Sequence, residues 1–466
     1  MHAVLLILYI SLILAVIFLE RKTPVEALLW VLVLVCLPYV GVVLYLVFGS
    51  TIAIKLTTYV RKRRLQKLQP ASAPPTADLT GMPLSDEDQQ VVHFNAAYND
   101  SELTSYTDAQ LFITGESHYR QLFADIRAAK RCIHVEFYTI HHDQVGEALV
   151  NALADQARAG IQVRVLCDFI ANLSTPQAMF RPLLDAGGQV IRVKPYLTHY
   201  RSHRKIVVID NQIAYIGGMN VGKQYANLAP VKTPWRDTQV RLTGPCTQVL
   251  DSLFLTDWLC SVRRRDWDRE VAYAADFPRH GSAVDGNLCQ FIVGGVDTRK
   301  ESVKMCYLSM IRSARKRIRI QTPYFIPDAS ILDALKTAAA AGVQIELMVP
   351  GIKASFFLDP VTTAYCGELL AYGAKVYKYR GYIHAKTMVV DEELCCIGSV
   401  NMDMRSLQVD DEICGVFYAN ALIGRYLDIF DRDIDSCTPY TLEEFETRSR
   451  KERIMESIFL LFAPLM

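Results

Sequence analysis

The chain has 466 residues, of which 51% are hydrophobic and 21% are charged, and its formal net charge is +1. This length exceeds one typical domain and allows more than one hydrophobic core. A net charge so close to zero creates no overall field that would attract nucleic acid, and we therefore expect no nucleic-acid partner.

The chain starts with two apolar, nearly uncharged stretches, residues 3–19 and 27–48. Each is about long enough to cross a hydrocarbon core of ~30 Å, so residues 1–60 are predicted to form a transmembrane helical hairpin. We expect no cleaved signal peptide, because no basic segment precedes the first stretch. Basic residues crowd the exit of the second stretch, and the positive-inside rule then places the rest of the chain in the cytoplasm. These residues are Lys55, Arg61, Lys62, Arg63, Arg64 and Lys67.

The remainder of the chain is predicted to form a linker and two lobes. Residues 61–88 contain several prolines and are typical of a linker. Helical and strand patterns then alternate in both halves, which predicts two α/β sandwich lobes at residues 89–280 and 281–466. Residues 447–466 combine basic residues with an apolar run. They are predicted to form an amphipathic helix, either at a membrane interface or packed on the protein or on a second subunit.

One pattern of polar residues occurs twice, once in each predicted lobe. Its first copy consists of His203, Lys205, Asp210, Gly217 and Asn220, and its second copy of His384, Lys386, Asp391, Gly398 and Asn401. Because the same residue types recur at identical offsets, the sequence predicts an internal duplication.

Each copy of the pattern is predicted to form a β-hairpin. In the first copy, side-chain alternation puts His203 and Lys205 on one face of a strand. A turn centred between residues 211 and 212 would place Asn220 opposite His203, and the same arithmetic in the second copy would place Asn401 opposite its histidine. The aspartate of each copy falls at the turn, so we expect it to hold the hairpin rather than touch a substrate.

Two such hairpins facing each other suit chemistry on a phosphodiester. One imidazole attacks phosphorus while the other protonates the leaving oxygen, and the lysines and asparagines hold the nonbridging oxygens. Lysine supplies the positive charge, so we expect neither a metal nor a cofactor. The twelve cysteines show no Cys-x-x-Cys spacing and are predicted to be buried, reduced residues. The alternative, in which both histidines are ordinary strand residues, is disfavoured by the doubling.

The doubled pattern resembles that of the phospholipase D superfamily, which carries His-x-Lys-x4-Asp-x6-Gly-Gly/Ser-x-Asn twice per active site. Trp235-Arg236-Asp237 and the segment Arg405 to Glu412 resemble the family segments that supply a carboxylate to each histidine. The resemblance implies that Asp237 and Glu412 accept a hydrogen bond from the imidazoles and set their tautomer. It also implies a catalytic motif of His203, Lys205, Asp210, His384, Lys386 and Asp391. Asp410 departs from the pattern, because the family usually has asparagine there.

Within the superfamily, the chain is similar to bacterial cardiolipin synthases of the two-transmembrane type. The similarity includes segments between Glu20 and Gly49, the segment Thr322 to Pro327, and Tyr382 to Lys386. It implies an enzyme of the bacterial inner membrane, with its catalytic portion in the cytoplasm. Two phosphatidylglycerol molecules would give cardiolipin and glycerol through a phosphatidyl-histidine, with His203 as nucleophile and His384 as acid and base. Hydrolysis to phosphatidic acid, transfer from another donor such as phosphatidylethanolamine, and a homo-oligomer all stay open.

Overall fold

The computed structural model describes most of the chain in two units. The described residues are 9–14, 16, 18, 24–49, 58–61, 63–64, 79, 82, 84–194, 201–228, 234–278, 287–295 and 301–463. The first unit comprises Met1–Arg63 with Pro195–Tyr200, and the second comprises Arg64–Lys194 with Arg201–Met466.

The first unit contains helix α2 (Pro24–Cys36), helix α3 (Pro38–Leu44) and a π-helical turn (Tyr45–Gly49). The apolar stretch 27–48 is therefore not one continuous helix. It breaks at Leu37, whose φ of −129° and ψ of 67° lie outside the helical region. Proline disfavours a helical conformation in the residue before it, and Pro38 accounts for the break. Within the described ranges, the structure has no helix whose length and apolar character would suffice to cross a bilayer.

Several sequence-based expectations lie outside the described residues. They include most of the stretch 3–19, most of the predicted linker 61–88, and Lys55, Lys62 and Lys67 of the basic cluster. The end of the predicted linker is described, and it belongs to helix α5 (Asp86–Asn99).

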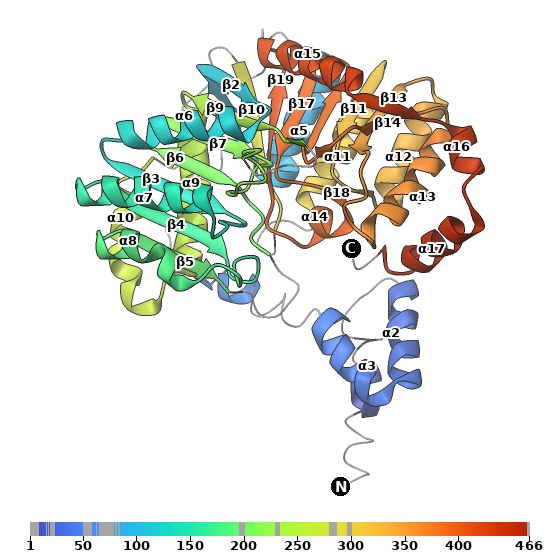
Figure 1. The fold of residues 1–466 in the computed structure, drawn as a ribbon, viewed down its shortest axis with the longest axis horizontal. Coiled ribbons are helices and arrows are strands. Elements are labelled where there is room, and N and C mark those ends of the chain that lie inside the picture. The colour runs from blue at the N-terminus through green and yellow to red at the C-terminus, as the bar shows by residue number, and fades with distance from the viewer. Residues whose placement is uncertain are drawn as a thin grey trace. The chain divides into compact units, whose positions relative to one another are not determined.

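The second unit is built on two large sheets (Figure 1). The seven strands of the first sheet, in spatial order, are β2 (Asp108–Phe112), β9 (Gln239–Thr243), β7 (Ile213–Gly217), β6 (Ile206–Ile209), β3 (Cys132–Phe137), β4 (Gln162–Asp168) and β5 (Gln189–Val193). Strands β3, β4 and β5 are parallel, and the other pairings are antiparallel. The helices of this half are α6 (Gly115–Ala128), α7 (Gln144–Arg158), α8 (Arg181–Asp185), α9 (Cys246–Ser261) and α10 (Trp267–Ala275), with 3-10 turns at Gln177–Phe180 and Arg264–Asp266.

The second sheet repeats the first and adds one strand at each edge. Its order is β1 (Thr104–Tyr106), β10 (Asn287–Val293), β19 (Ile413–Tyr418), β17 (Leu394–Gly398), β16 (Thr387–Val390), β11 (Arg317–Gln321), β13 (Gln344–Pro350), β14 (Lys375–Tyr379) and β20 (Cys437–Tyr440). Read in spatial order from β10 to β14, its seven inner strands correspond one by one to the seven strands of the first sheet, read from β2 to β5. The predicted duplication is therefore visible in the topology.

Short elements and further helices complete the second half. The helices are α11 (Ser302–Ser313), α12 (Ala329–Ala340), α13 (Leu358–Leu370), α14 (Met404–Gln408), α15 (Ala421–Asp435), α16 (Leu442–Glu446) and α17 (Arg450–Leu460). Two small sheets pair β12 (Phe325–Ile326) with β18 (Met402–Asp403), and β15 (Tyr382–Ile383) with β8 (Trp235–Arg236).

The two sheets pack against each other through an apolar core. Ile206, Val208 and Ile216 of the first sheet and Val389 and Ile397 of the second are buried in one cluster. Helices α6, α7 and α8 cover the other face of the first sheet, while α5 and α11 to α14 cover the other face of the second. Burial of both faces explains why the central strands carry unbroken apolar runs.

The boundary between the halves differs from the predicted one. The sequence predicts that residues 89–106 belong to the first lobe, but α5 packs on α11, and Thr104 of β1 pairs with Cys289 of β10. Asn95 also donates a hydrogen bond to the Tyr418 hydroxyl. This pairing with a strand far along the chain leaves no local signal in the sequence.

The first hairpin differs from its prediction by one position. Strands β6 and β7 pair with Ile209 opposite Ile213, so three residues form the loop. Residues 210–211 have φ values of 56° and 57°, a left-handed turn that matches the twist of the strands. The turn is thus centred on residue 211 rather than between 211 and 212, which shifts the pairing register by one residue, and the predicted pairing of Asn220 with His203 is wrong.

The second hairpin turns in the same way. Residues 391–392 have φ values of 51° and 66°, and Val390 lies opposite Leu394. The predicted pairing of Asn401 with His384 is therefore wrong for the same reason. In both copies, the histidine and the lysine lie just before the first strand of the hairpin rather than within it.

Candidate active site

Two short backbone bridges join the halves at the histidines. Strand β15 pairs in parallel with β8, and the His384 N–H donates to the Arg236 carbonyl at 2.6 Å. In the same way, Ser202 bridges Asp411, and the His203 N–H donates to the Asp411 carbonyl at 2.9 Å. Each histidine is thereby placed beside the acidic segment of the other repeat.

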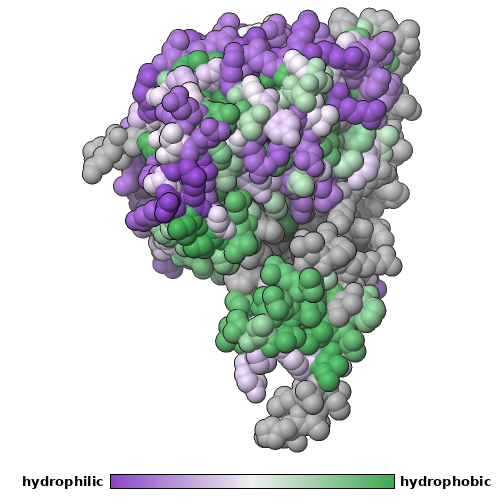
Figure 2. All heavy atoms as spheres, turned by 90° about the vertical axis from the view of Figure 1, so that its right-hand side faces the viewer, coloured by the Kyte–Doolittle hydropathy of each residue, from purple (hydrophilic) through white to green (hydrophobic). Residues whose placement is uncertain are grey.

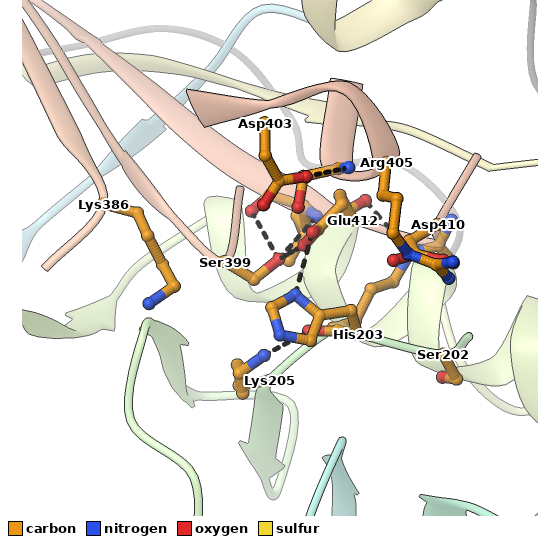
Figure 3. Close-up of polar contacts among 12 residues, drawn as sticks. Ser202, His203, Lys205, Lys386, Ser399, Asp403, Arg405, Asp410 and Glu412 are labelled. Carbon is orange, nitrogen blue, oxygen red and sulfur yellow. Dashed lines mark hydrogen bonds and ion pairs between the residues drawn. The ribbon is translucent and has the colours of Figure 1, made fainter. Parts of the chain in front are cut away.

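The side chains continue this crossed arrangement. His203 Nδ1 lies 2.8 Å from Glu412 Oε1, and His384 Nδ1 lies 2.6 Å from Asp237 Oδ2. The Ser399 hydroxyl donates to the other oxygen of Glu412, so that carboxylate is fixed on both sides (Figure 3). A neutral imidazole that donates its Nδ1–H to a carboxylate presents the lone pair of Nε2 to the site.

Both motif lysines are buried in the same place. Lys205 and Lys386 each donate to the carbonyl of the histidine two residues earlier, at 2.5 Å. Burial lowers the pKa of Lys205 to about 7 and that of Lys386 to about 8, and in Lys205 the nearby Lys386 contributes. Figure 3 shows the Lys205 ammonium beside His203, and the charge of Lys386 lowers the pKa of both His203 and Lys205. The predicted convergence of the two repeats is therefore present in the structure.

The histidines are held in their neutral form. Burial, followed by the charges of the two lysines, holds the pKa of His203 well below its usual range. Burial and Lys386 lower the pKa of His384 to about 4, although Asp237 opposes this. The Lys386 ammonium is also 3.0 Å from His384 Nδ1. Because Nδ1 carries the hydrogen that it donates to Asp237, it cannot accept one from the ammonium, which donates to the His384 carbonyl instead.

A cluster of buried acidic groups lies beside His203. Burial raises the pKa of Glu412 to about 7 and that of Asp410 to about 7. Asp410 accepts a hydrogen bond from Arg405 at 3.0 Å, and the charge of Arg405 partly offsets the effect of burial. The departure of Asp410 from the family pattern thus places an extra ionisable group next to Glu412.

The two asparagines of the motif have different environments. Asn220 is buried, accepts a hydrogen bond from the Thr139 N–H at 3.2 Å, and donates to the Tyr225 hydroxyl at 2.9 Å. In contrast, the Oδ1 atom of Asn401 is buried and has no hydrogen-bond partner. Their predicted role in holding phosphoryl oxygens stays a prediction.

The two motif aspartates lie at the far end of their strands from the histidines. Asp210 accepts hydrogen bonds from the backbone N–H groups of Lys130, Arg131 and Cys132, at 2.7 to 3.0 Å. Asp391 accepts the equivalent three from Arg315, Lys316 and Arg317. These contacts anchor each hairpin to the start of the neighbouring strand, which agrees with a structural role.

The site is suited to an anion. Two buried ammonium groups and two imidazoles converge, and the carboxylates are turned toward the imidazoles. Among the residues that the structure describes, no three His, Cys, Asp or Glu side chains cluster in a way that could hold a metal ion.

Comparisons with known proteins show the family of this chain. A family model described as "Cardiolipin synthase, PLD-like domain" matches residues 122–229 and 307–434, and a "Phospholipase_D-nuclease N-terminal" model matches residues 7–50. A cardiolipin synthase of Oceanobacillus iheyensis is 33% identical, over 99% of this chain and 98% of its own length. The major cardiolipin synthase ClsA of Bacillus subtilis shows the same identity and coverage. The chain belongs to the cardiolipin synthase family.

A solved structure supports the fold of this family member. The crystal structure of phosphatidylserine synthase from Haemophilus influenzae aligns with a TM-score of 0.62 and 14% identity, over 81% of this chain and 97% of that one. At this identity the likeness concerns the fold alone, a duplicated phospholipase D-like α/β architecture.

In the sequence of this cardiolipin synthase family member, Trp235 and Tyr382 stand out only as parts of family segments, and no aromatic residues are predicted beside the two histidines. The ring of His384 lies 5.4 to 5.9 Å from those of Tyr225, Trp235 and Tyr382, whereas Tyr138 lies 4.7 Å from His203. Trp235 directly precedes the Arg-Asp pair after the first motif, which is the sequence signal that could have indicated it.

Proposed function

We propose that the protein is a cardiolipin synthase that transfers a phosphatidyl group from one phosphatidylglycerol to another, giving cardiolipin and glycerol. The observation that carries this proposal is the crossed pairing of His203 with Glu412 and of His384 with Asp237 around two buried lysines. This arrangement offers a nucleophile, an acid-base group and two charges for the phosphoryl oxygens.

In the first step, the Nε2 lone pair of His203 attacks phosphorus. The bond between phosphorus and the glycerol oxygen breaks, and His384 gives its proton to that oxygen. The phosphatidyl group is then covalently bound to His203, and glycerol leaves. Lys205 and Lys386 offset the negative charge on the nonbridging oxygens.

His384 must carry a proton to act as the acid, although its pKa is lowered to about 4. The charge of Lys386 contributes to this lowering, and a phosphodiester held between the lysines offsets that charge. Substrate binding therefore raises the pKa of His384 and protonates it when the proton is needed.

In the second step, His384 takes the proton from the terminal hydroxyl of another phosphatidylglycerol. That oxygen attacks phosphorus, the bond to His203 breaks, and cardiolipin leaves. Water would give phosphatidic acid instead, so it must be kept from the intermediate. The side chains of His203 and His384 are only 12% and 11% exposed, which favours transfer over hydrolysis.

We also propose that the N-terminal unit attaches the enzyme to the bacterial inner membrane, with the catalytic unit in the cytoplasm. The family model matching residues 7–50 supports the attachment to a membrane. Apolar side chains of this unit are also strongly exposed, including Leu28, Tyr39 and Val43 at 70%, 87% and 60%. A soluble surface rarely exposes so many apolar residues together.

The direct test is a product assay with the purified full-length protein. Phosphatidylglycerol labelled in its phosphate and in its glycerol headgroup should give one free glycerol for each cardiolipin. Phosphatidic acid as the main product would identify a hydrolase, and the absence of both products would contradict the proposal. Adding labelled phosphatidylethanolamine in a parallel reaction tests the other donor.

A further inference from the structure

An exposed apolar surface lies on α17, on the two residues that follow it and on the loop before α13. We call it the α17 patch, and it consists of Phe356, Phe357, Ile454, Ile458, Leu461 and Phe462, which are between 47% and 73% exposed. Figure 2 shows hydrophobic side chains gathered on the face of the molecule that carries this helix. Single exposed apolar residues are ordinary, but six from two segments in one place need an explanation.

Helix α17 is already folded and held without this surface. Its opposite face buries Phe459 against Ile326 and Val361. Arg448 forms a two-pronged ion pair with the buried Glu456, at 2.8 and 2.9 Å. The outer apolar residues therefore contribute little to holding the helix in place, and they remain available for another contact.

The loop packs against the helix that carries the rest of the patch. The rings of Phe356 and Phe357 lie 5.3 and 5.1 Å from the ring of Phe459, whose helix carries the rest of the patch. A shallow groove on α17 is lined by Ile454, Ile458 and Leu461 together with Arg453 and Ser457.

Cations surround the patch. Arg450, Lys451 and Arg453 are exposed on α17, and Lys353 is exposed on the loop. Of the two acidic side chains on the helix, Glu456 is paired with Arg448, and Glu452 caps the helix through Ser449. Apolar and aromatic residues flanked by basic residues are the composition that binds the interface of an anionic bilayer. A second copy would bring like charges together across a symmetric contact, which disfavours a dimer.

A short chain of packed residues connects the patch with the active site. Tyr324 and Met404 pack in the same cluster as Phe459. The Tyr324 hydroxyl lies 2.7 Å from that of Tyr382, and the Tyr382 ring lies 5.9 Å from the His384 ring. A lipid surface covering the patch would therefore lie next to the site.

We propose that the α17 patch inserts into the interface of an anionic lipid bilayer and brings the catalytic unit to its lipid substrate. The inference rests on the proposed function in one respect, because it takes the substrate to be a membrane lipid. The contact itself is independent of catalysis and is tested separately from it.

A probe of the environment tests the contact in the full-length protein. Ile458→Cys, in a background with the exposed Cys36 replaced by Ser, is labelled with a fluorophore and reconstituted into vesicles of phosphatidylglycerol and phosphatidylcholine. Ala341→Cys is the control. Ala341 is exposed and lies between α12 and the start of β13, at the end of the strands that is far from the histidines. Protein without an introduced cysteine gives the background.

Nitroxide-labelled lipid should quench the label at position 458 several-fold more strongly than the label at position 341. Equal quenching at the two positions would overturn the proposal. If a second copy or another part of the chain covered position 458, the label there would not be quenched by the lipid. That result would also overturn the proposal.

Activity measurements test the consequence. The exposed side chains make Ile454→Gln, Ile458→Gln and Leu461→Gln compatible with folding, and the combined variant should lose about tenfold of its activity on vesicles. Its activity on phosphatidylglycerol in detergent micelles should stay within about twofold of the parent, since the site is untouched. Unchanged activity on vesicles would contradict the docking role. A wrong product in micelles would instead count against the proposed function.

Discussion

The two halves of the active site share a backbone plan but differ in what surrounds each histidine. Next to Asp237 the first repeat has Gly218, where an added Cβ would come within 2.2 Å of the carboxylate. At the equivalent position the second repeat has Ser399, whose hydroxyl donates to Glu412. The shorter aspartate lies close to the backbone, while the longer glutamate leaves room for a serine.

The environments differ in polarity as well. His203 lies near Arg405 and near Asp410, whose pKa is raised by burial. His384 instead lies among the aromatic rings of Tyr225, Trp235 and Tyr382. A duplicated pair of motifs can thus give two chemically different histidines. This difference supports different roles for the two residues, a nucleophile and a proton carrier.

The largest effect should come from removing either histidine. His203→Ala and His384→Ala should each lower the rate of cardiolipin formation by about 10³-fold or more, because nucleophilic and acid-base steps both fail. His93→Ala, at an exposed histidine of α5, is the matched control and should be neutral. Near-normal activity of either active-site variant, measured with labelled phosphatidylglycerol, would contradict the two-histidine scheme.

Removing a carboxylate tests the crossed pairing. Asp237→Asn and Glu412→Gln should each lower kcat by about 10²-fold, because an amide NH2 that donates to Nδ1 holds the imidazole in the wrong tautomer and the negative charge is lost. Proton NMR should show the loss of the His384 Nδ1–H signal in Asp237→Asn only, and of the His203 signal in Glu412→Gln only. Loss of the His203 signal in Asp237→Asn and of the His384 signal in Glu412→Gln would show that each repeat orients its own histidine.

Exchanging the small residues tests the difference between the halves. Gly218→Ser should displace Asp237 and lower kcat by about 10²-fold, since the added Cβ would come within 2.2 Å of Asp237 Oδ1. Ser399→Gly removes the hydrogen bond to Glu412 and the contacts of the hydroxyl with the Ile413 backbone, and a loss of about tenfold is expected. Equal losses in a kcat comparison would mean that the two carboxylates are held in the same way.

The lysines predict how anion binding depends on pH. Since the pKa of Lys205 is lowered to about 7 and that of Lys386 to about 8, their charges are lost as the pH rises through this range. The affinity for tungstate, a phosphate mimic, should fall by about tenfold between pH 7 and pH 9. Lys386→Arg keeps its charge and should flatten the upper part of the profile. An affinity independent of pH in calorimetry would contradict these lowered pKa values.

The smallest effect on catalysis is expected at the hairpin turns. Asp210→Ala and Asp391→Ala each remove three backbone hydrogen bonds, which should cost about 1–3 kcal/mol of unfolding free energy. In denaturant melts both variants should be less stable, while kcat per folded molecule stays within about twofold. A large loss of kcat without a loss of stability would instead indicate a direct catalytic role.

The sequence was sufficient for the parts of the site that depend on the repeated motif. Equal offsets of His, Lys and Asn predicted two equivalent hairpins, and their convergence follows from the duplicated sheets. The pairing partners were not predictable from spacing alone. A three-residue loop with left-handed residues at 210–211 shifted the register by one position.

Features that depend on distant contacts were also missed. Strand β1 lies early in the chain but pairs with β10 of the second sheet, which moved the boundary between the lobes. Nothing near Asp237 shows that it serves His384 rather than His203, because that choice is made by the bridge between β8 and β15. In contrast, the amphipathic helix predicted within residues 447–466 is present over the shorter range Arg450–Leu460, and it was readable because it depends only on helical periodicity.

The most direct test of the account is to trap the covalent intermediate. His384→Ala should be mixed with a phosphatidyl ester of p-nitrophenol, whose leaving group departs without a proton. The account predicts one equivalent of nitrophenolate and a phosphatidyl adduct on His203, because no base remains to activate the acceptor. Mass spectrometry that finds the adduct on another residue, or an adduct on His384 when His203→Ala is used instead, would contradict it.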